Sequence, residues 1–267
     1  MTMIGTTIGL ALQLSAAPAF MLQSGATRAP ADIPAVYRVR FEQCIDLATD
    51  DPISGVTEAN AWLIEGGKYY ARHCLGYAYS AQGQWTLASN AFERAARDAG
   101  NAKDKRSANL WAQAGNSSLA GGDAQSALGY FNEALIQGGL KKADRGEIYL
   151  DRARAQVGLK QYEQARKDFD KAHTLVPEDP LGWLLSATLA RRMGQLERAQ
   201  ADIQVAATIA PGDPSVGLEA GNIAFKAGKF DVAKRNWQQS VKVAPQSKAA
   251  IAAAKYLKQL EEQQAKK

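Results

Sequence analysis

Two cysteines and two histidines are the rarest side chains of this sequence among those that could serve as nucleophile, general base or metal ligand. His73 directly precedes Cys74, as the members of a Cys-His nucleophile pair could do. Adjacent residues on a helix, however, point about 100° apart, so the imidazole would not readily take the thiol proton. His173 lies far along the chain and fits a solvated residue in the last turn of a helix. Two cysteines without a nearby histidine pair do not make a zinc site, so we expect no metal.

The remaining motifs also argue against catalysis. The sequence has no His-Glu-x-x-His zinc motif, no glycine-rich phosphate loop ending in Gly-Lys-Ser/Thr, and no Gly-x-Ser-x-Gly elbow. Charges alternate in sign between residues 163 and 171, which include Arg166 and Asp168, and this pattern is typical of a solvated helix face. We therefore predict that the protein is not an enzyme and uses no cofactor.

The first 27 residues carry no charged side chain, and an apolar stretch runs from Ile4 to Leu14. Residues 17–19 (Ala-Pro-Ala) then supply the small side chains of a secretory cleavage site, and residues 24–26 form a second such site. We predict a signal-peptide-like segment over residues 1–19, with cleavage after residue 26 as the variant, and a linker over 20–34. No Lys or Arg lies near Met1, so a misplaced start codon and a disordered apolar tail stay open as alternatives.

This segment bears on the compartment and on the cysteines. Its apolar runs are shorter than the ~20 residues that span a bilayer, so no permanent membrane anchor is expected. We expect an exported chain, periplasmic if the source is a Gram-negative bacterium; a cytoplasmic chain is the alternative. Export favours a disulfide between Cys44 and Cys74, which would close a loop of 31 residues. Such a loop contributes about 3–4 kcal/mol in the chain-entropy model, and two buried reduced thiols are the alternative.

A fixed period of 34 residues predicts the architecture that holds these side chains. Prolines and alanines mark the period at a constant phase: Pro177, Pro211 and Pro245 with Ala165, Ala199 and Ala233. Within residues 180–211, Gly194 separates two helical patterns at 181–193 and 196–209. A period of this length is typical of stacked helix pairs, which bury their apolar faces only against their neighbours.

Earlier units keep this pattern with two differences. The unit that ends at Pro177 has Lys160 where the others have glycine, so we expect its turn to be closed differently. The phase-matched alanines lie at positions 88, 127, 165, 199 and 233, so the first two steps carry extra residues. We place these extra residues in the linkers around 103–105 and 139–141.

Five units share this phase between Tyr69 and Pro245, or two thirds of the chain. The first clear unit has these matching residues: Leu75, Gly76, Tyr79, Gly83, Trp85, Ala88, Phe92 and Ala95. The pattern resembles the tetratricopeptide repeat family. The resemblance implies an all-α fold, a right-handed α-solenoid of stacked antiparallel helix pairs. The five repeats are predicted at about 69–102, 108–141, 146–179, 180–213 and 214–247.

Less regular segments flank the five repeats. Residues 35–68 resemble a degenerate leading helix pair, with Ala59, Trp62 and Leu63 on its second helix. Residues 246–267 are predicted as a C-terminal capping helix and tail, whose polar outer side would keep the end of a solenoid soluble.

In tetratricopeptide repeat proteins the first helices of successive units line the concave side, where partners bind. Carried over residue by residue, the resemblance implies these partner-binding candidates: Tyr70, His73, Tyr77, Asn109, Asn116, Glu147, Arg154, Leu184, Thr188, Arg191, Asn222 and Phe225. Arg154 and Arg191 at the centre favour an acidic or C-terminal peptide. The family's carboxylate-clamp subtype needs Lys and Asn where this chain has His73 and Tyr77, which argues against that subtype. A polar concave surface without an occupant is the alternative.

Charge is unevenly distributed along the chain: the net charge is −2 over residues 28–100, +1 over 101–179 and +6 over 180–267. The basic C-terminal third would suit an acidic protein or an anionic membrane surface, or it is a solubilising cap. No nucleic acid is expected, because no recognised nucleic-acid-binding module is present. We therefore predict a non-enzymatic protein–protein interaction scaffold of the cell envelope. The alternative is an accessory subunit that stabilises an envelope enzyme or a secretion or assembly machine without reading a peptide, which a large apolar convex patch would favour.

Overall fold

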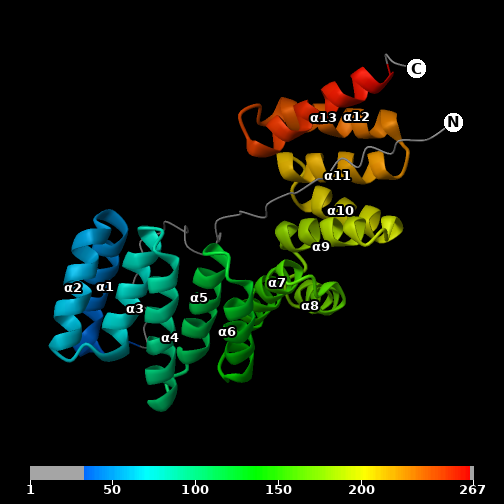
Figure 1. Ribbon diagram of the computed structural model, residues 1–267. Coiled ribbons are helices and arrows are strands. Elements are labelled where there is room, and N and C mark those ends of the chain that lie inside the picture. Colours follow the sequence, from blue (N-terminus) through cyan, green and yellow to red (C-terminus); the bar gives the residue numbers. More distant parts are fainter. Residues whose placement is uncertain (1–32, 265–267) are drawn as a thin grey trace.

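The computed structural model describes residues 33–264 of the 267-residue chain, and this described part is built from α-helices without a strand (Figure 1). The helices have these bounds: α1 Ala35–Asp50, α2 Pro52–Ile64, α3 Lys68–Ala81, α4 Trp85–Asn101, α5 Ser107–Ala120, α6 Ala124–Ile136, α7 Lys142–Gly158, α8 Tyr162–Leu175, α9 Pro180–Arg192, α10 Leu196–Ile209, α11 Pro214–Lys226, α12 Phe230–Val243 and α13 Lys248–Gln264.

The helices stack as consecutive antiparallel pairs, from α1–α2 at one end of the molecule to α11–α12 at the other, where α13 follows as a single terminal helix (Figure 1). This arrangement confirms the predicted all-α solenoid, with five regular pairs, an irregular leading pair and a terminal helix. The predicted segment 1–19, both cleavage positions and the part of the predicted linker 20–34 that precedes residue 33 lie outside the described residues. Among the described helices, none is long and apolar enough to span a membrane.

Small residues of each first helix make room for a large ring of the second helix. A Cβ added to Gly76 would lie 2.5 Å from the Phe92 ring, and one added to Gly221 would lie 2.3 Å from Trp237. Phe92 is fully buried as a result. The repeated glycine and aromatic positions are therefore a packing requirement, because a larger side chain would push the two helices of a pair apart.

The turn at Lys160 is closed in the same way as the glycine turns, so the expectation of a different closure is wrong. Lys160 takes the left-handed conformation itself, with φ at 61°, as Gly194 does with φ at 77°. Its N–H donates to the Val157 carbonyl, and the next N–H donates to Gln156, the same pattern as around Gly194. A lysine can replace the glycine here at the steric cost of a left-handed L-residue.

A disulfide ties the irregular leading pair to the first regular repeat. Cys44 on α1 and Cys74 on α3 are bonded, with their Cα atoms 6.0 Å apart and both side chains fully buried. Phe41, Trp62 and Tyr70 surround the bond in one apolar cluster. Because Cys74 is used in this bond, it is not available as the thiol of a Cys-His pair.

The expectation of a solvated face over residues 163–171 holds for Glu163, Lys167, Asp170 and Lys171, which are exposed, and is wrong for the other two charged residues. Arg166 and Asp168 are only 7% and 2% exposed, because they form contacts between helices instead of facing water. Asp168 accepts two hydrogen bonds from Arg152 of α7, and Arg166 donates to the hydroxyl of Ser186 on α9. His173 lies in the last turn of α8, as predicted, but its ring stacks on Trp183 at 3.6 Å between centroids.

Candidate functional site

All twelve partner-binding candidates lie on the first helices α3, α5, α7, α9 and α11, and we call this set the first-helix row. Several members pair sideways with the neighbouring first helix. The Gln113 amide of α5 donates to the Tyr77 hydroxyl of α3 at 2.8 Å. Burial raises the pKa of the Asp151 carboxyl on α7. Arg154 and the Asn116 side chain of α5 partly offset this rise. The row therefore holds successive repeats together as well as lining one face.

His73 lies in an aromatic cluster at the N-terminal end of the row. Its ring centroid is 5.2 Å from that of Phe41, 5.1 Å from Tyr77 and 5.9 Å from Phe92. Its Nε2 is buried and has no hydrogen-bond partner within the described part of the chain. Burial in this apolar environment, with a smaller contribution from Arg106, lowers the pKa of His73 to about 3, so the imidazole is neutral at pH 7.

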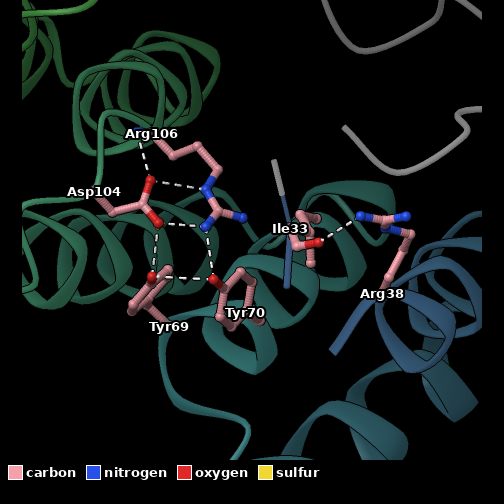
Figure 2. A network of polar contacts seen from close by, with 6 residues as sticks. All are labelled: Ile33, Arg38, Tyr69, Tyr70, Asp104 and Arg106. Carbon is pink, nitrogen blue, oxygen red and sulfur yellow. Dashed lines mark hydrogen bonds and ion pairs between the residues drawn. The ribbon is translucent and has the colours of Figure 1, made fainter. Parts of the chain in front are cut away.

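Tyr70 is part of a polar network that joins α3 to the loop before α5, as Figure 2 shows. Arg106 donates to the Tyr70 hydroxyl at 2.6 Å and to Asp104 Oδ1 at 2.9 Å, while Tyr69 donates to Asp104 Oδ2 at 2.7 Å. Tyr70 is only 3% exposed, so its ring packs inside this junction. In the same view, Arg38 donates to the Ile33 carbonyl and holds the start of α1.

Arg191 forms a buried ion pair, which changes the interpretation of the predicted cationic centre. Its guanidinium donates to both carboxylate oxygens of Glu219 on α11, at 2.6 and 3.2 Å. Asn222 donates to the same carboxylate and accepts a hydrogen bond from the Trp237 indole. The charge of Arg191 is thus balanced inside the stack between the last two regular pairs.

A small crevice of about 10 Å³ lies on the first-helix row where α7, α8 and α9 meet. Its walls come from both sides of this junction: Arg154, Val157, Phe169, Leu185, Thr188, Leu189 and Arg192. The lining is apolar apart from Thr188 and the two arginines. Arg154 is itself held by Asp151 at 2.7 Å.

Arg154 and Thr188 of this crevice were predicted as binding residues, whereas Val157, Phe169, Leu185, Leu189 and Arg192 were missed. Spacing contains a signal for two of the missed residues, because Arg192 follows Thr188 by four positions and Val157 follows Arg154 by three. The same rule finds Gln113, which precedes Asn116 by three positions. The carbonyl oxygens of the Gln113 and Asn116 side chains are buried and accept no hydrogen bond from any described residue.

Metal-ligating side chains do not gather into a metal site in the part of the chain that the structure describes. No group of three His, Cys, Asp or Glu side chains has the arrangement of a metal site there. Near the crevice, burial raises the pKa of Glu147, with smaller contributions from Asp151 and Asp144. This face therefore offers hydrogen-bond acceptors, two arginines and an apolar floor, which are features that bind a chain.

Stacked helix pairs with a shared first-helix row define an α-solenoid repeat protein. The chain belongs to the tetratricopeptide repeat family, whose model matches residues 75–142 and 144–214, just over half of the sequence. No curated protein sequence matches the chain.

Solved structures share the fold at low sequence identity. The crystal structure of PilW, described as a widely conserved type IV pilus biogenesis factor, has a TM-score of 0.69 at 14% identity, covering 83% of this chain and 99% of that one. The pilF protein of Pseudomonas aeruginosa has a TM-score of 0.62 at 17% identity, covering 87% and 100%. YrrB, described as having an unusual peptide-binding site, has a TM-score of 0.55 at 17% identity, covering 74% and 97%. At these identities the likeness concerns the fold.

Proposed function

We propose that this chain is a non-enzymatic scaffold of the cell envelope that binds a partner protein or peptide along the first-helix row. The observation that carries this proposal is the α7–α9 crevice, where an apolar floor made by Phe169, Leu185 and Leu189 lies between Arg154 and Arg192. At about 10 Å³ the crevice is too small to enclose a side chain, so it serves as a contact point for the tip of one apolar side chain of a peptide. The arginines favour acidic groups on either side of this point.

The remaining row supplies contacts for the backbone of such a peptide. Asn109 of α5 is exposed on this row, so its side-chain oxygen can accept a hydrogen bond from a peptide N–H. A groove that combines one apolar anchor with backbone acceptors binds an extended segment without strict sequence requirements. The peptide-binding site named for YrrB supports this use of the fold by analogy.

Export to the envelope is the second part of the proposal. It is supported by the signal-like residues 1–19 and by the Cys44–Cys74 disulfide, because structural disulfides persist in oxidising compartments. Mass spectrometry of the chain from its natural cell, with thiols alkylated before and after reduction, tests this part. We expect loss of the first 19 or 26 residues and labelling only after reduction. A full-length chain with two freely labelled thiols would contradict export.

Site-specific photo-crosslinking tests the binding face. A crosslinking amino acid at Thr188, in the crevice, should capture a discrete partner in the natural cell. The same amino acid at Gln238, an exposed position on the second helix α12, is the matched control and should not. Equal capture at both positions, or at neither, would contradict the proposed face.

The charge contribution is tested with the same crosslinker at Thr188. Arg192→Glu should lower the yield about tenfold, because a favourable charge contact becomes a repulsion. Arg235→Glu, on the exposed side of α12, changes the net charge equally and should leave the yield unchanged. If both substitutions reduced capture alike, the effect would be one of overall charge and the crevice would not be the binding site.

An accessory subunit without peptide reading is the second candidate, and exposed isoleucines on second helices favour it. Ile53 and Ile64 on α2 and Ile136 on α6 are mostly exposed to solvent. Crosslinking from Ile64 with no capture from Thr188 would select this function over peptide binding.

A further inference from the structure

The two ends of the solenoid carry complementary surfaces, and the first of them is the outer side of α1 and α2. Val36 and Val39 are 80% and 62% exposed, and Leu47 lies about two turns beyond Val39 on the same face of α1. Together with Arg40, Gln43, Asp46 and Glu58 they line an open hollow of about 570 Å³. A terminal repeat usually has a polar outer face, so this apolar hollow at the end of the stack is unusual.

The opposite end is formed by α12 and α13. Lys248, Ile251, Lys255 and Lys258 follow one another at three- and four-residue spacing, so they lie on one exposed face of α13. Ile251 is 59% exposed at the centre of the lysines. This face is an apolar residue surrounded by positive charge, in place of the wholly polar back that a cap needs.

The charges of the two ends are opposite and equal. Residues 35–64 hold two basic and five acidic side chains, a net charge of −3. Residues 230–264 hold six basic and three acidic side chains, a net charge of +3. Helices α1 and α2, which line the hollow, and α13, which carries Ile251 and the lysines, lie at opposite ends of the solenoid (Figure 1). Asp46 and Glu58 border the hollow, and Glu58 is already paired with Arg40.

We propose that this chain associates head to tail with copies of itself, the α13 face of one copy occupying the α1–α2 hollow of the next. Ile251 of one copy contacts Val36 and Val39 of the other, and the lysines lie near Asp46 and Glu58. This goes beyond the proposed partner binding and uses surfaces outside the crevice. Because the contact joins two different surfaces, each added copy still offers a free end, and association continues past a dimer.

Sedimentation velocity on the native chain tests the assembly. We expect the weight-average mass to rise above that of two chains as the concentration approaches roughly the millimolar range, where small interfaces associate, and to fall as salt screens the charges. A mass of one chain throughout would overturn the proposal. The proposal would also be overturned if the mass stayed at one chain because residues 1–32 occupy the hollow in place of a second copy.

Two variants, each with one end blocked, distinguish this geometry from a symmetric dimer. Val39→Asp blocks the hollow and Ile251→Asp blocks the α13 face, so each variant alone should sediment as one chain. In a mixture, the Val39→Asp chain still has an intact α13 face and the Ile251→Asp chain still has an intact hollow. The two variants should therefore form a one-to-one dimer that does not grow further. If Val39→Asp alone were monomeric while Ile251→Asp still associated, the contact would be between two α1 helices and the proposal would be overturned.

Two controls separate the result from misfolding and from partner binding. Ile136→Asp introduces the same charge at an exposed isoleucine in the middle of the stack and should leave self-association unchanged. Helical circular dichroism should match between all variants, because every substituted side chain is at the surface. Crosslinking from Thr188 tests partner binding at the crevice independently of self-association. Failure of self-association therefore leaves the scaffold proposal standing, and failure of crosslinking leaves the self-association proposal standing.

Discussion

At the scale of single residues, Lys160 shows how far a side chain can depart from the repeat pattern without changing the backbone. Its left-handed conformation costs an L-residue about 1–2 kcal/mol, and glycine would remove that cost while adding unfolded-state entropy. We expect Lys160→Gly to raise the free energy of unfolding by about 0.5–1 kcal/mol. Urea denaturation measures this, and Gly194→Lys should have the opposite effect. A lower midpoint for Lys160→Gly would contradict this account of the turn.

His73 gives a second prediction at this scale, on the pH dependence of stability. Its pKa falls from the ordinary 6.5 to about 3 in the folded chain, so between these values the unfolded state binds more protons. Stability therefore decreases as the pH falls through 6.5, by up to about 1.4 kcal/mol per unit, and the contribution of His73 to the slope fades about one pH unit above 6.5. His73→Gln should flatten the slope of urea midpoints between pH 6.5 and 5. His173→Gln is the comparison, because burial also lowers that pKa, though less strongly.

Single residues are also where sequence reasoning was weakest. Alternating charges between 163 and 171 look the same whether they face water or bridge to a neighbouring helix, so the burial of Arg166 and Asp168 was not foreseeable. The first-helix positions were predictable from the repeat, because the phase fixes which helix each residue lies on. Their sideways contacts, such as Tyr77 with Gln113, depend on the rotation between adjacent repeats, which no spacing within one repeat contains.

At the scale of elements, the disulfide fixes α1 onto α3. Replacing Cys44 and Cys74 together with serine should lower the free energy of unfolding by about 3 kcal/mol, because the unfolded loop is no longer closed. Hydrogen exchange should then accelerate in α1 and α2 before the regular repeats. Exchange that rose equally along the whole chain would show that the leading pair is not a separate cooperative unit.

The elements themselves were largely predictable from the 34-residue period. Proline at Pro180 and Pro214, each after a capping aspartate, marks the starts of α9 and α11, and both caps are formed. The extra residues of the first step were placed in the linker around 103–105, and this is incomplete. Helix α4 has 17 residues where α8, α10 and α12 have 14, so part of the insertion lengthens a helix.

At the scale of the whole molecule, a stack of repeats unfolds according to its weakest junction. Glu219→Gln leaves Arg191 buried without a balancing charge, and we expect it to cost about 3 kcal/mol. Helices α11 to α13 should then unfold first, which would split the denaturation curve into two transitions. Glu262→Gln removes an exposed pair with Lys258 and should change stability by less than about 0.5 kcal/mol. A single unshifted transition for Glu219→Gln would contradict the role given to this pair.

The sideways contacts along the first-helix row also set the curvature of the molecule. Each bridge, Tyr77 to Gln113 or Arg191 to Glu219, is a spacer whose length helps to fix the angle between one repeat and the next. A shorter side chain at such a position changes that angle slightly. The change displaces all the repeats that follow, and the displacement is largest for the last repeat. Substitutions at these positions can therefore abolish the fit of a long partner by changing the pitch of the superhelix, without removing any contact to that partner.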